Sequence, residues 1–264
     1  DFIVLNDLTS SSEIISRDIT AGLRFEISGF LICAGYAVGV QLLPAKYILS
    51  DEFKSHNFFY RLLISIILSA IHTSRYVFAW FCAESSWRAL GGAEINEERI
   101  SSIVPSVYYT SRKLSTLAIE WNRAIHFTLK ECLHVRLISL GLPPIVGKVA
   151  SFAVSAMWHG FYSGYYLFAV LETCMGILDE FRYKYFTPLL TDVFGSKIAL
   201  YFDIICVQSL NYFMGAPWDL YWSECYLEFY STMKYAPFFI WIALITIGFI
   251  YCSLFRKKKK ERKD

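Results

Sequence analysis

The chain has 264 residues, of which 55% are apolar and only 18% are charged, with a mean hydropathy of +0.40. A soluble domain carries about 25% charged residues, so this composition argues against a soluble protein and favours a membrane protein. The net charge of +2 is too balanced to suggest a nucleic-acid-binding surface.

Three uncharged apolar runs are long enough to cross a bilayer as helices. They lie at 27–45, 149–171 and 235–255 and contain 19, 23 and 21 residues. A helix needs roughly 20 residues to cross the hydrocarbon core, so each run is a candidate span.

Two further apolar runs, at 58–83 and 198–218, contain charged residues, namely Arg61, Arg75 and Asp203. They can span if these side chains face the bundle interior or reach the interface. Only helices satisfy their own backbone hydrogen bonds in lipid. We therefore predict an all-α, polytopic transmembrane helix bundle with at least five spans.

The stretch at 95–144 has a different character. It mixes charged and hydroxyl side chains with aromatics and holds no apolar run of 18 residues. A solvated loop is one interpretation, but the content of Trp, Tyr, Phe and Leu is too high for a solvated linker. We expect an interfacial or membrane-embedded helical segment that ends at Pro143-Pro144, because paired prolines stop a helix.

The tail at 256–264 is strongly basic and directly follows the last run. By the positive-inside rule it predicts a cytoplasmic C-terminus, for which a plain stop-transfer anchor is sufficient. The tail also resembles a dibasic endoplasmic-reticulum retrieval signal, with Lys260 and Arg262 in the places usually held by two lysines. Because the chain starts with Asp1 rather than Met, we expect residues 1–264 to be a single membrane domain from the C-terminal part of a longer chain.

The seven cysteines are scattered along the chain, never in CxxC spacing, and most lie in apolar stretches. A free cysteine in such a stretch behaves as a small hydrophobic residue. We therefore expect no disulfide framework and no metal site.

His159 is the most informative single residue. It is the eleventh of the 23 residues at 149–171, so it lies near the bilayer midplane if that run spans. An ionisable side chain at that depth is costly and indicates function, and imidazole, with an ordinary pKa near 6.5, can act as a base near neutral pH. The alternative is a histidine that only hydrogen-bonds a neighbouring helix.

Small and aromatic residues surround this histidine. Gly160 and Gly164 form a GxxxG pair, which is typical of close helix packing but also leaves room for a narrow cavity. Trp158, Tyr165 and Tyr166 would supply an aromatic wall to such a cavity.

A second polar cluster lies earlier in the chain. If that stretch is helical, Asn122, His126 and Lys130 recur every four residues and form one polar stripe, with Trp121 in an apolar stripe beside it. An amphipathic helix with a wet face is the simpler interpretation. In the functional interpretation Asn122 donates its amide to a carbonyl, while Lys130 and Arg123 lie near phosphate or coenzyme A groups.

Together these residues resemble the membrane-bound O-acyltransferase superfamily, and most closely its lysophospholipid acyltransferase branch. That branch carries a Trp-Asn followed by a Trp-Leu-Lys, and later a Trp-His-Gly-x-x-Pro-Gly-Tyr-Tyr. The matching residues here are Trp121-Asn122-Arg123, Lys130, Trp158-His159-Gly160 and Gly164-Tyr165-Tyr166. Thr128 replaces the Trp of Trp-Leu-Lys, and Ser163 replaces the Pro. The resemblance extends from about Phe58 to the basic tail.

The resemblance implies transfer of a fatty acyl group from acyl-CoA to the free glycerol hydroxyl of a lysophospholipid, in the endoplasmic reticulum. His159 and Asn122 would be catalytic. The implied substrate-binding residues are Trp121, Arg123, His126, Lys130, Trp158, Gly160, Gly164, Tyr165 and Tyr166. Acyl-CoA would be a co-substrate with no further cofactor, and the partners would be lysophospholipid, acyl-CoA and membrane lipid, with no nucleic acid. A homo-oligomer is left open.

Three other interpretations are left open. Another member of the superfamily would acylate a sterol, diacylglycerol or secreted peptide, although the Trp-His-Gly-x-x-x-Gly-Tyr-Tyr string favours the lysophospholipid branch. A non-enzymatic transporter or channel subunit would use His159 and Arg75 as intramembrane polar groups and would have discontinuous helices in paired halves. A truncated chain without activity is the third.

Overall fold

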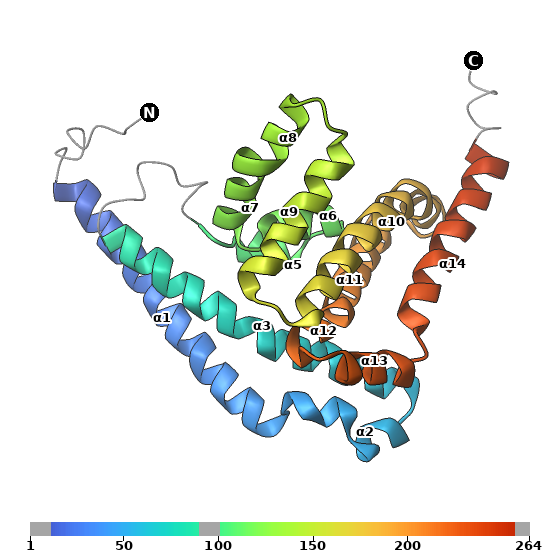
Figure 1. Cartoon of the computed structure of the whole chain (residues 1–264), viewed down its shortest axis with the longest axis horizontal. Coiled ribbons are helices and arrows are strands. Elements are labelled where there is room, and N and C mark those ends of the chain that lie inside the picture. Colours follow the sequence, from blue (N-terminus) through green and yellow to red (C-terminus); the bar gives the residue numbers. More distant parts are fainter. Residues whose placement is uncertain (1–11, 90–100, 257–264) are drawn as a thin grey trace.

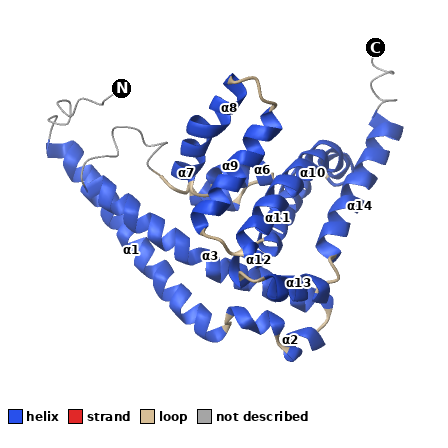
Figure 2. Ribbon diagram, in the orientation of Figure 1, coloured by secondary structure: helices blue, strands red, loops and turns tan. Residues whose placement is uncertain are grey.

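The computed structural model describes residues 12–89 and 101–256. Within these ranges every regular element is a helix and no strand occurs (Figures 1 and 2). The predicted all-α bundle is therefore confirmed. Residues 95–100 of the predicted embedded segment, and the basic tail beyond Arg256, lie outside the described residues.

A long helical hairpin forms one side of the molecule (Figure 1). Its two arms, α1 (Ser12–Leu42) and α3 (Phe58–Ala89), pack along each other and are joined by two short helices, η2 (Ala45–Leu49) and α2 (Asp51–Ser55). Ser50 caps α2, because its hydroxyl accepts a hydrogen bond from the backbone N–H of Phe53 at 3.1 Å. Many apolar side chains of α1 are exposed, as expected for a helix that faces lipid.

The segment predicted as embedded is helical but broken into short pieces. In chain order they are α5 (Pro105–Tyr109), α6 (Leu114–Glu120), α7 (Arg123–Leu129), η4 (Lys130–His134) and α8 (Val135–Ser139). The last three continue one another, and η4 and α8 pack against the next helix, α9 (Pro144–His159), which begins at the paired prolines (Figure 1). Because Pro144 occupies the first turn of α9, its missing N–H costs that helix nothing.

The run at 149–171, predicted as one continuous span, is instead divided between two helices. α9 ends at His159, and α10 (Ser163–Phe194) begins four residues later. Gly160 has φ 120° and ψ −175°, a conformation that L side chains rarely adopt and that no helix continues. The prediction that His159 lies midway along a spanning helix was wrong, because a count of uncharged residues does not detect a glycine break.

The C-terminal part comprises α11 (Ser196–Met214), α12 (Ala216–Leu220), α13 (Ser223–Thr232), α14 (Ala236–Tyr251) and η5 (Cys252–Arg256). α10 packs against both α11 and α14. At Gly248 of α14 the helices are so close that an added Cβ would lie 2.5 Å from the backbone nitrogen of Phe186 on α10.

Four helical segments of the described chain are long and apolar enough to cross a membrane. They are Gly22–Leu49, Phe58–Ala89, Ser196–Leu220 and Ala236–Phe255. Four of the five predicted runs fall in these segments, and the chain is an integral membrane protein.

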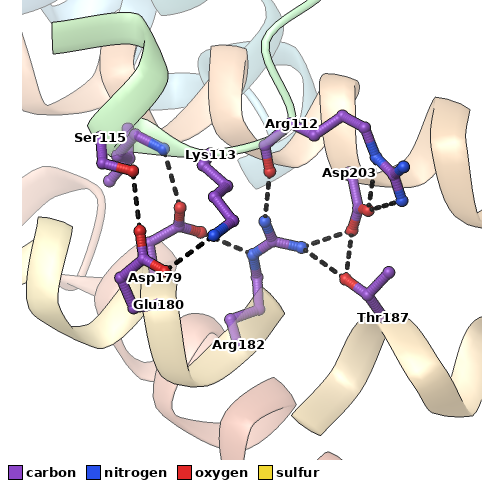
Figure 3. A network of polar contacts seen from close by, with 9 residues as sticks. Arg112, Lys113, Ser115, Asp179, Glu180, Arg182, Thr187 and Asp203 are labelled. Carbon is purple, nitrogen blue, oxygen red and sulfur yellow. Dashed lines mark hydrogen bonds and ion pairs between the residues drawn. The ribbon is translucent and has the colours of Figure 1, made fainter. Parts of the chain in front are cut away.

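A buried network of charged side chains ties the short helices to the bundle (Figure 3). Arg182 of α10 donates from Nε to Asp179 at 2.7 Å, from Nη1 to Asp203 of α11, and from Nη2 to the backbone carbonyl of Arg112 at 2.8 Å. The three side chains of Asp179, Arg182 and Asp203 have no exposed surface. Charges buried this deeply in a membrane protein need one another as partners, which explains how a spanning helix accommodates Asp203.

The same network fixes the start of α6. The second carboxylate oxygen of Asp179 accepts a hydrogen bond from the backbone N–H of Leu114 at 2.7 Å, and so satisfies one of the N–H groups that a helix leaves open at its N-terminus. Arg112 reaches the other oxygen of Asp203 at 2.8 Å. The turn before α6 is thus held to α10 and α11 from both sides.

We expect Arg182→Met to destabilise the folded protein by about 3–5 kcal/mol, because it leaves two buried carboxylates without their central partner. Thermal unfolding in detergent measures the loss. Lys113→Met is the control: its 2.9 Å pair with Glu180 is partly exposed, so its loss costs about 1 kcal/mol or less. Equal midpoints for the two variants would contradict the structural role assigned to Arg182.

Candidate active site

A cavity of about 440 Å³ lies among α6, α7, η4, α9, α10 and the α11–α12 junction. Aromatic and aliphatic side chains make up most of its wall, with a few polar groups between them. Asn122 and His159, which the sequence predicts as the catalytic pair, both line it, Asn122 from the turn between α6 and α7 and His159 from the end of α9. A largely apolar cavity with few convergent polar groups is the usual form of a small-molecule site.

Asn122 occupies the junction between α6 and α7. Its backbone has φ 48° and ψ 60°, the left-handed conformation that asparagine tolerates better than most residues. The predicted polar stripe exists, since Asn122, His126 and Lys130 all line the cavity. However, Asn122 precedes the first turn of α7 instead of lying within the helix.

The ring of Trp121 anchors this junction. It packs against Trp80 at 4.6 Å and against Tyr76 and Tyr108 at 5.7 Å each, measured between ring centroids. On the other side of Asn122, the backbone N–H of Arg123 donates to the carbonyl of Ser102 at 2.9 Å. Both neighbours of Asn122 are therefore fixed, which limits the directions available to its amide.

His159 is the last residue of α9, and its side chain is exposed at the edge of the cavity. Its ring packs edge-on against Trp218 of α12 at 4.4 Å and lies 5.6 Å from the ring of Tyr165. The indole N–H of Trp218 donates to the hydroxyl of Tyr76 at 2.7 Å, and Arg75 donates to the same hydroxyl at 3.0 Å. These contacts hold the wall against which the imidazole rests.

Tyr76 connects the two halves of the site. Its ring contacts Trp121, next to Asn122, and its hydroxyl holds Trp218, next to His159. Tyr76 and Trp218 are not among the residues predicted from the sequence, because neither has a local motif and both lie in apolar runs where aromatics are common. Asp219, which also lines the cavity and approaches Arg75 at 3.5 Å, was missed as well.

The predicted substrate-binding residues fall into two groups. Four of them line the cavity, namely Trp121, His126, Lys130 and Tyr165. The others, Arg123, Trp158, Gly160, Gly164 and Tyr166, are not part of its lining.

Two of the residues outside the lining, Arg123 and Gly164, have contacts elsewhere in the structure. Arg123 forms an ion pair with Glu120 at 3.1 Å, while Trp158 is 64% exposed on the outer side of α9. Gly164 allows α10 to contact the backbone carbonyl of Pro217, where a Cβ would collide, and its N–H donates to the carbonyl of Tyr221 at 2.9 Å. Its small size serves close packing, the first of the two interpretations of the GxxxG pair.

Burial lowers the pKa of His126, and the positive charge of the neighbouring Lys130 lowers it further. His126 lies on α7, outside the four candidate spans. Its imidazole is consequently neutral at pH 7, so it lines the cavity as a hydrogen-bonding group and not as a fixed charge.

The chain is similar in sequence to several known proteins. The sequence model that defines the membrane-bound O-acyltransferase family matches residues 9–214 of this chain. A lysophospholipid acyltransferase of Saccharomyces cerevisiae is 28% identical over 152 residues, which cover 52% of this chain and 25% of the yeast protein. The human membrane-bound glycerophospholipid O-acyltransferase 2 is 24% identical over 238 residues, which cover 84% of this chain and 42% of the human protein.

A third relative, lysophospholipid acyltransferase 6 of Drosophila melanogaster, is 23% identical over 171 residues, covering 61% of this chain and 23% of the fly protein. The chain thus spans less than half the length of each of these relatives. The family match includes Asn122 and His159 and covers most of the sequence. The chain belongs to the membrane-bound O-acyltransferase family.

Proposed function

We propose that this protein transfers a fatty acyl group from acyl-CoA to the free glycerol hydroxyl of a lysophospholipid. The observation that carries the proposal is that Asn122 and His159, from separate segments of the chain, line one largely apolar cavity. A site within a membrane protein also excludes the water that would otherwise hydrolyse a thioester. The names of the similar proteins favour a lysophospholipid as the acyl acceptor.

In the proposed mechanism His159 is the general base. Its neutral imidazole removes the proton from the glycerol hydroxyl as the oxygen attacks the thioester carbonyl carbon. A carbon–oxygen bond forms, the carbonyl oxygen gains negative charge, and the amide N–H of Asn122 stabilises that charge. The carbon–sulfur bond then breaks, and the thiolate leaves with the electron pair and takes up the proton from His159.

No metal or cofactor is required for these steps. The leaving thiol has a pKa near 8.5 if it resembles a free cysteine thiol, so it needs little help from an acid. Acyl-CoA is proposed as the co-substrate, and the endoplasmic reticulum, with a cytoplasmic C-terminus, as the location. The basic residues of the C-terminal tail support that orientation.

The test is to incubate membranes that contain the protein with labelled acyl-CoA and a panel of lysophospholipids that differ in head group. We expect labelled diacyl phospholipid to form with at least one acceptor. Labelled product on a sterol or diacylglycerol, with none on any lysophospholipid, would assign a different acceptor and refute the proposal.

Tyr76→Phe should lower kcat about two- to tenfold with an unchanged KM. The substitution removes the hydroxyl that holds Trp218 and Arg75, and one hydrogen bond contributes about 0.5–1.5 kcal/mol. Steady-state kinetics measure the effect, with Tyr201→Phe as the control because Tyr201 is exposed on α11. A change confined to KM would show that Tyr76 acts on substrate binding and not on the position of His159.

A further inference from the structure

Glu172 of α10 is a buried carboxyl group in the cavity wall that the proposed mechanism does not use. Its side chain lines the cavity, and the residue is only 6% exposed. Its Oε2 atom has no hydrogen-bond partner among the described residues. Burying an ionisable group without a partner is costly, so such a group in a cavity wall indicates a ligand.

Two charged residues in the following turns of α10 differ from Glu172, because they have partners. Asp179 and Arg182 are fully buried on α10 too, but each has partners at hydrogen-bond distance (Figure 3). Within the part of the chain that the structure describes, the side chain of Glu172 forms no hydrogen bond and no ion pair within 4.0 Å. The fold therefore satisfies its structural charges and leaves this one facing the cavity.

Glu172 lies away from the reacting end of the cavity. Tyr165, which contacts His159, precedes it by seven residues on α10, a separation of about 10 Å along the helix axis. Phe168 and Gly176 continue the same cavity-facing surface of α10. A substrate whose reacting atoms lie beside His159 could thus extend about 10 Å to reach Glu172.

Basic side chains accompany Glu172 at this end of the cavity. Lys148 of α9 lines the cavity, and its Nζ atom lies 3.6 Å from the position that a Cβ of Gly176 would occupy, one turn of α10 beyond Glu172. His134 and Lys130 of η4 line the cavity as well, and the ring of His134 packs directly on Gly147, the neighbour of Lys148. Two lysines suit a phosphate group, whereas a carboxylate suits an ammonium or N–H donor.

We propose that Glu172 and Lys148 form a substrate-binding subsite for a group that combines a phosphate with a hydrogen-bond-donating nitrogen. The inference rests on the proposed acyl transfer in the same cavity. Two substrates of that reaction contain this chemistry: a lysophospholipid whose head group carries an amine, and acyl-CoA, whose arm carries amide N–H groups and phosphates. The subsite binds one of them and takes no part in the bond-making steps.

The test compares Glu172→Gln with wild-type protein in separate titrations of acyl-CoA and of the lysophospholipid. We expect the KM of one substrate to rise about tenfold, the effect of losing a hydrogen bond to a charged group, while kcat stays within twofold. Glu224→Gln is the matched control, because Glu224 is exposed on α13 and is not part of the cavity lining. Lys148→Met should raise the KM of the same substrate.

The two candidate ligands, the lysophospholipid head group and the arm of acyl-CoA, predict different kinetic results. A rise confined to the ethanolamine acceptor, with no change for lysophosphatidic acid, assigns the head group. A rise in the KM of acyl-CoA with every acceptor assigns the arm of the donor. If neither KM changes in either variant while both unfold at the wild-type temperature, the subsite is refuted.

The subsite can be tested even if the proposed acyl transfer is wrong. If wild-type protein transfers no acyl group, equilibrium binding of acyl-CoA and of lysophosphatidylethanolamine to purified wild-type and Glu172→Gln protein replaces the kinetic assay. Weaker binding of one of them to the variant supports the subsite, and equal binding of both refutes it.

Discussion

His159→Ala lowers the rate of acyl transfer by roughly 10²–10⁴-fold, the range by which a positioned general base contributes, while the protein still inserts in the membrane. The fold tolerates this change because the side chain is exposed at the end of α9 and lies outside the buried charge network. The measurement is the initial rate of phospholipid formation, normalised to the amount of protein in the membrane fraction.

His56→Ala is the matched control, since His56 ends the short helix α2 and is not part of the cavity lining. It should retain the wild-type rate. A His159→Ala protein with near-normal turnover would remove the general base from the mechanism, whatever the substrate.

Substitution of Asn122 is expected to have the second large effect on kcat. The left-handed backbone conformation of this residue makes a comparison of two variants informative. Asn122→Gly removes the amide but keeps a residue that adopts φ 48° without strain, whereas Asn122→Ala removes the amide and adds strain. If the amide stabilises the developing negative charge, both variants lose about 10²–10³-fold in kcat. Because only the alanine variant is strained, it should also unfold at a lower temperature.

Comparing these two variants distinguishes a role of the Asn122 amide in catalysis from a role of the residue in the backbone turn. Equal kcat values for the two variants, both well below wild type, assign the effect to the amide. A glycine variant with the wild-type rate and a slow alanine variant would show that the residue serves only the turn between α6 and α7.

Much of the fold follows from the distribution of charges along the sequence. Four uncharged or nearly uncharged runs coincide with the helices long enough to span a membrane, because length and apolarity are the properties that the bilayer selects. The run at 149–171 has the same composition, yet it breaks after His159. The signal was present in Gly160, but a glycine in an apolar run is equally typical of helix packing, and only its φ of 120° decides between the two.

The buried network could be predicted only in part. Asp203 is visible in the sequence as a charge within a candidate span, so it needs a partner. Its partners Arg182 and Arg112 are 21 and 91 residues away along the chain, and no local pattern connects them. For the same reason the role of Tyr76, which bridges Trp121 and Trp218, depends on tertiary packing and has no sequence motif.

The residues that line the cavity could likewise be predicted only in part. The four-residue spacing of Asn122, His126 and Lys130 predicted one polar surface, and all three line the cavity. Sequence adjacency was less informative. Trp158 and His159 are neighbours in the chain, yet Trp158 is 64% exposed away from the cavity, because successive residues on a helix face different directions.

The central claim is that one cavity brings a thioester and a glycerol hydroxyl together for direct acyl transfer. It is tested most directly by measuring free thiol released from acyl-CoA alongside the phospholipid formed, with and without lysophospholipid. The mechanism predicts one thiol for each phospholipid, and almost none when the acceptor is a diacyl phospholipid that lacks a free hydroxyl. Thiol release at the full rate without an acceptor, or acyl-CoA that stays intact with every lysophospholipid, would contradict it.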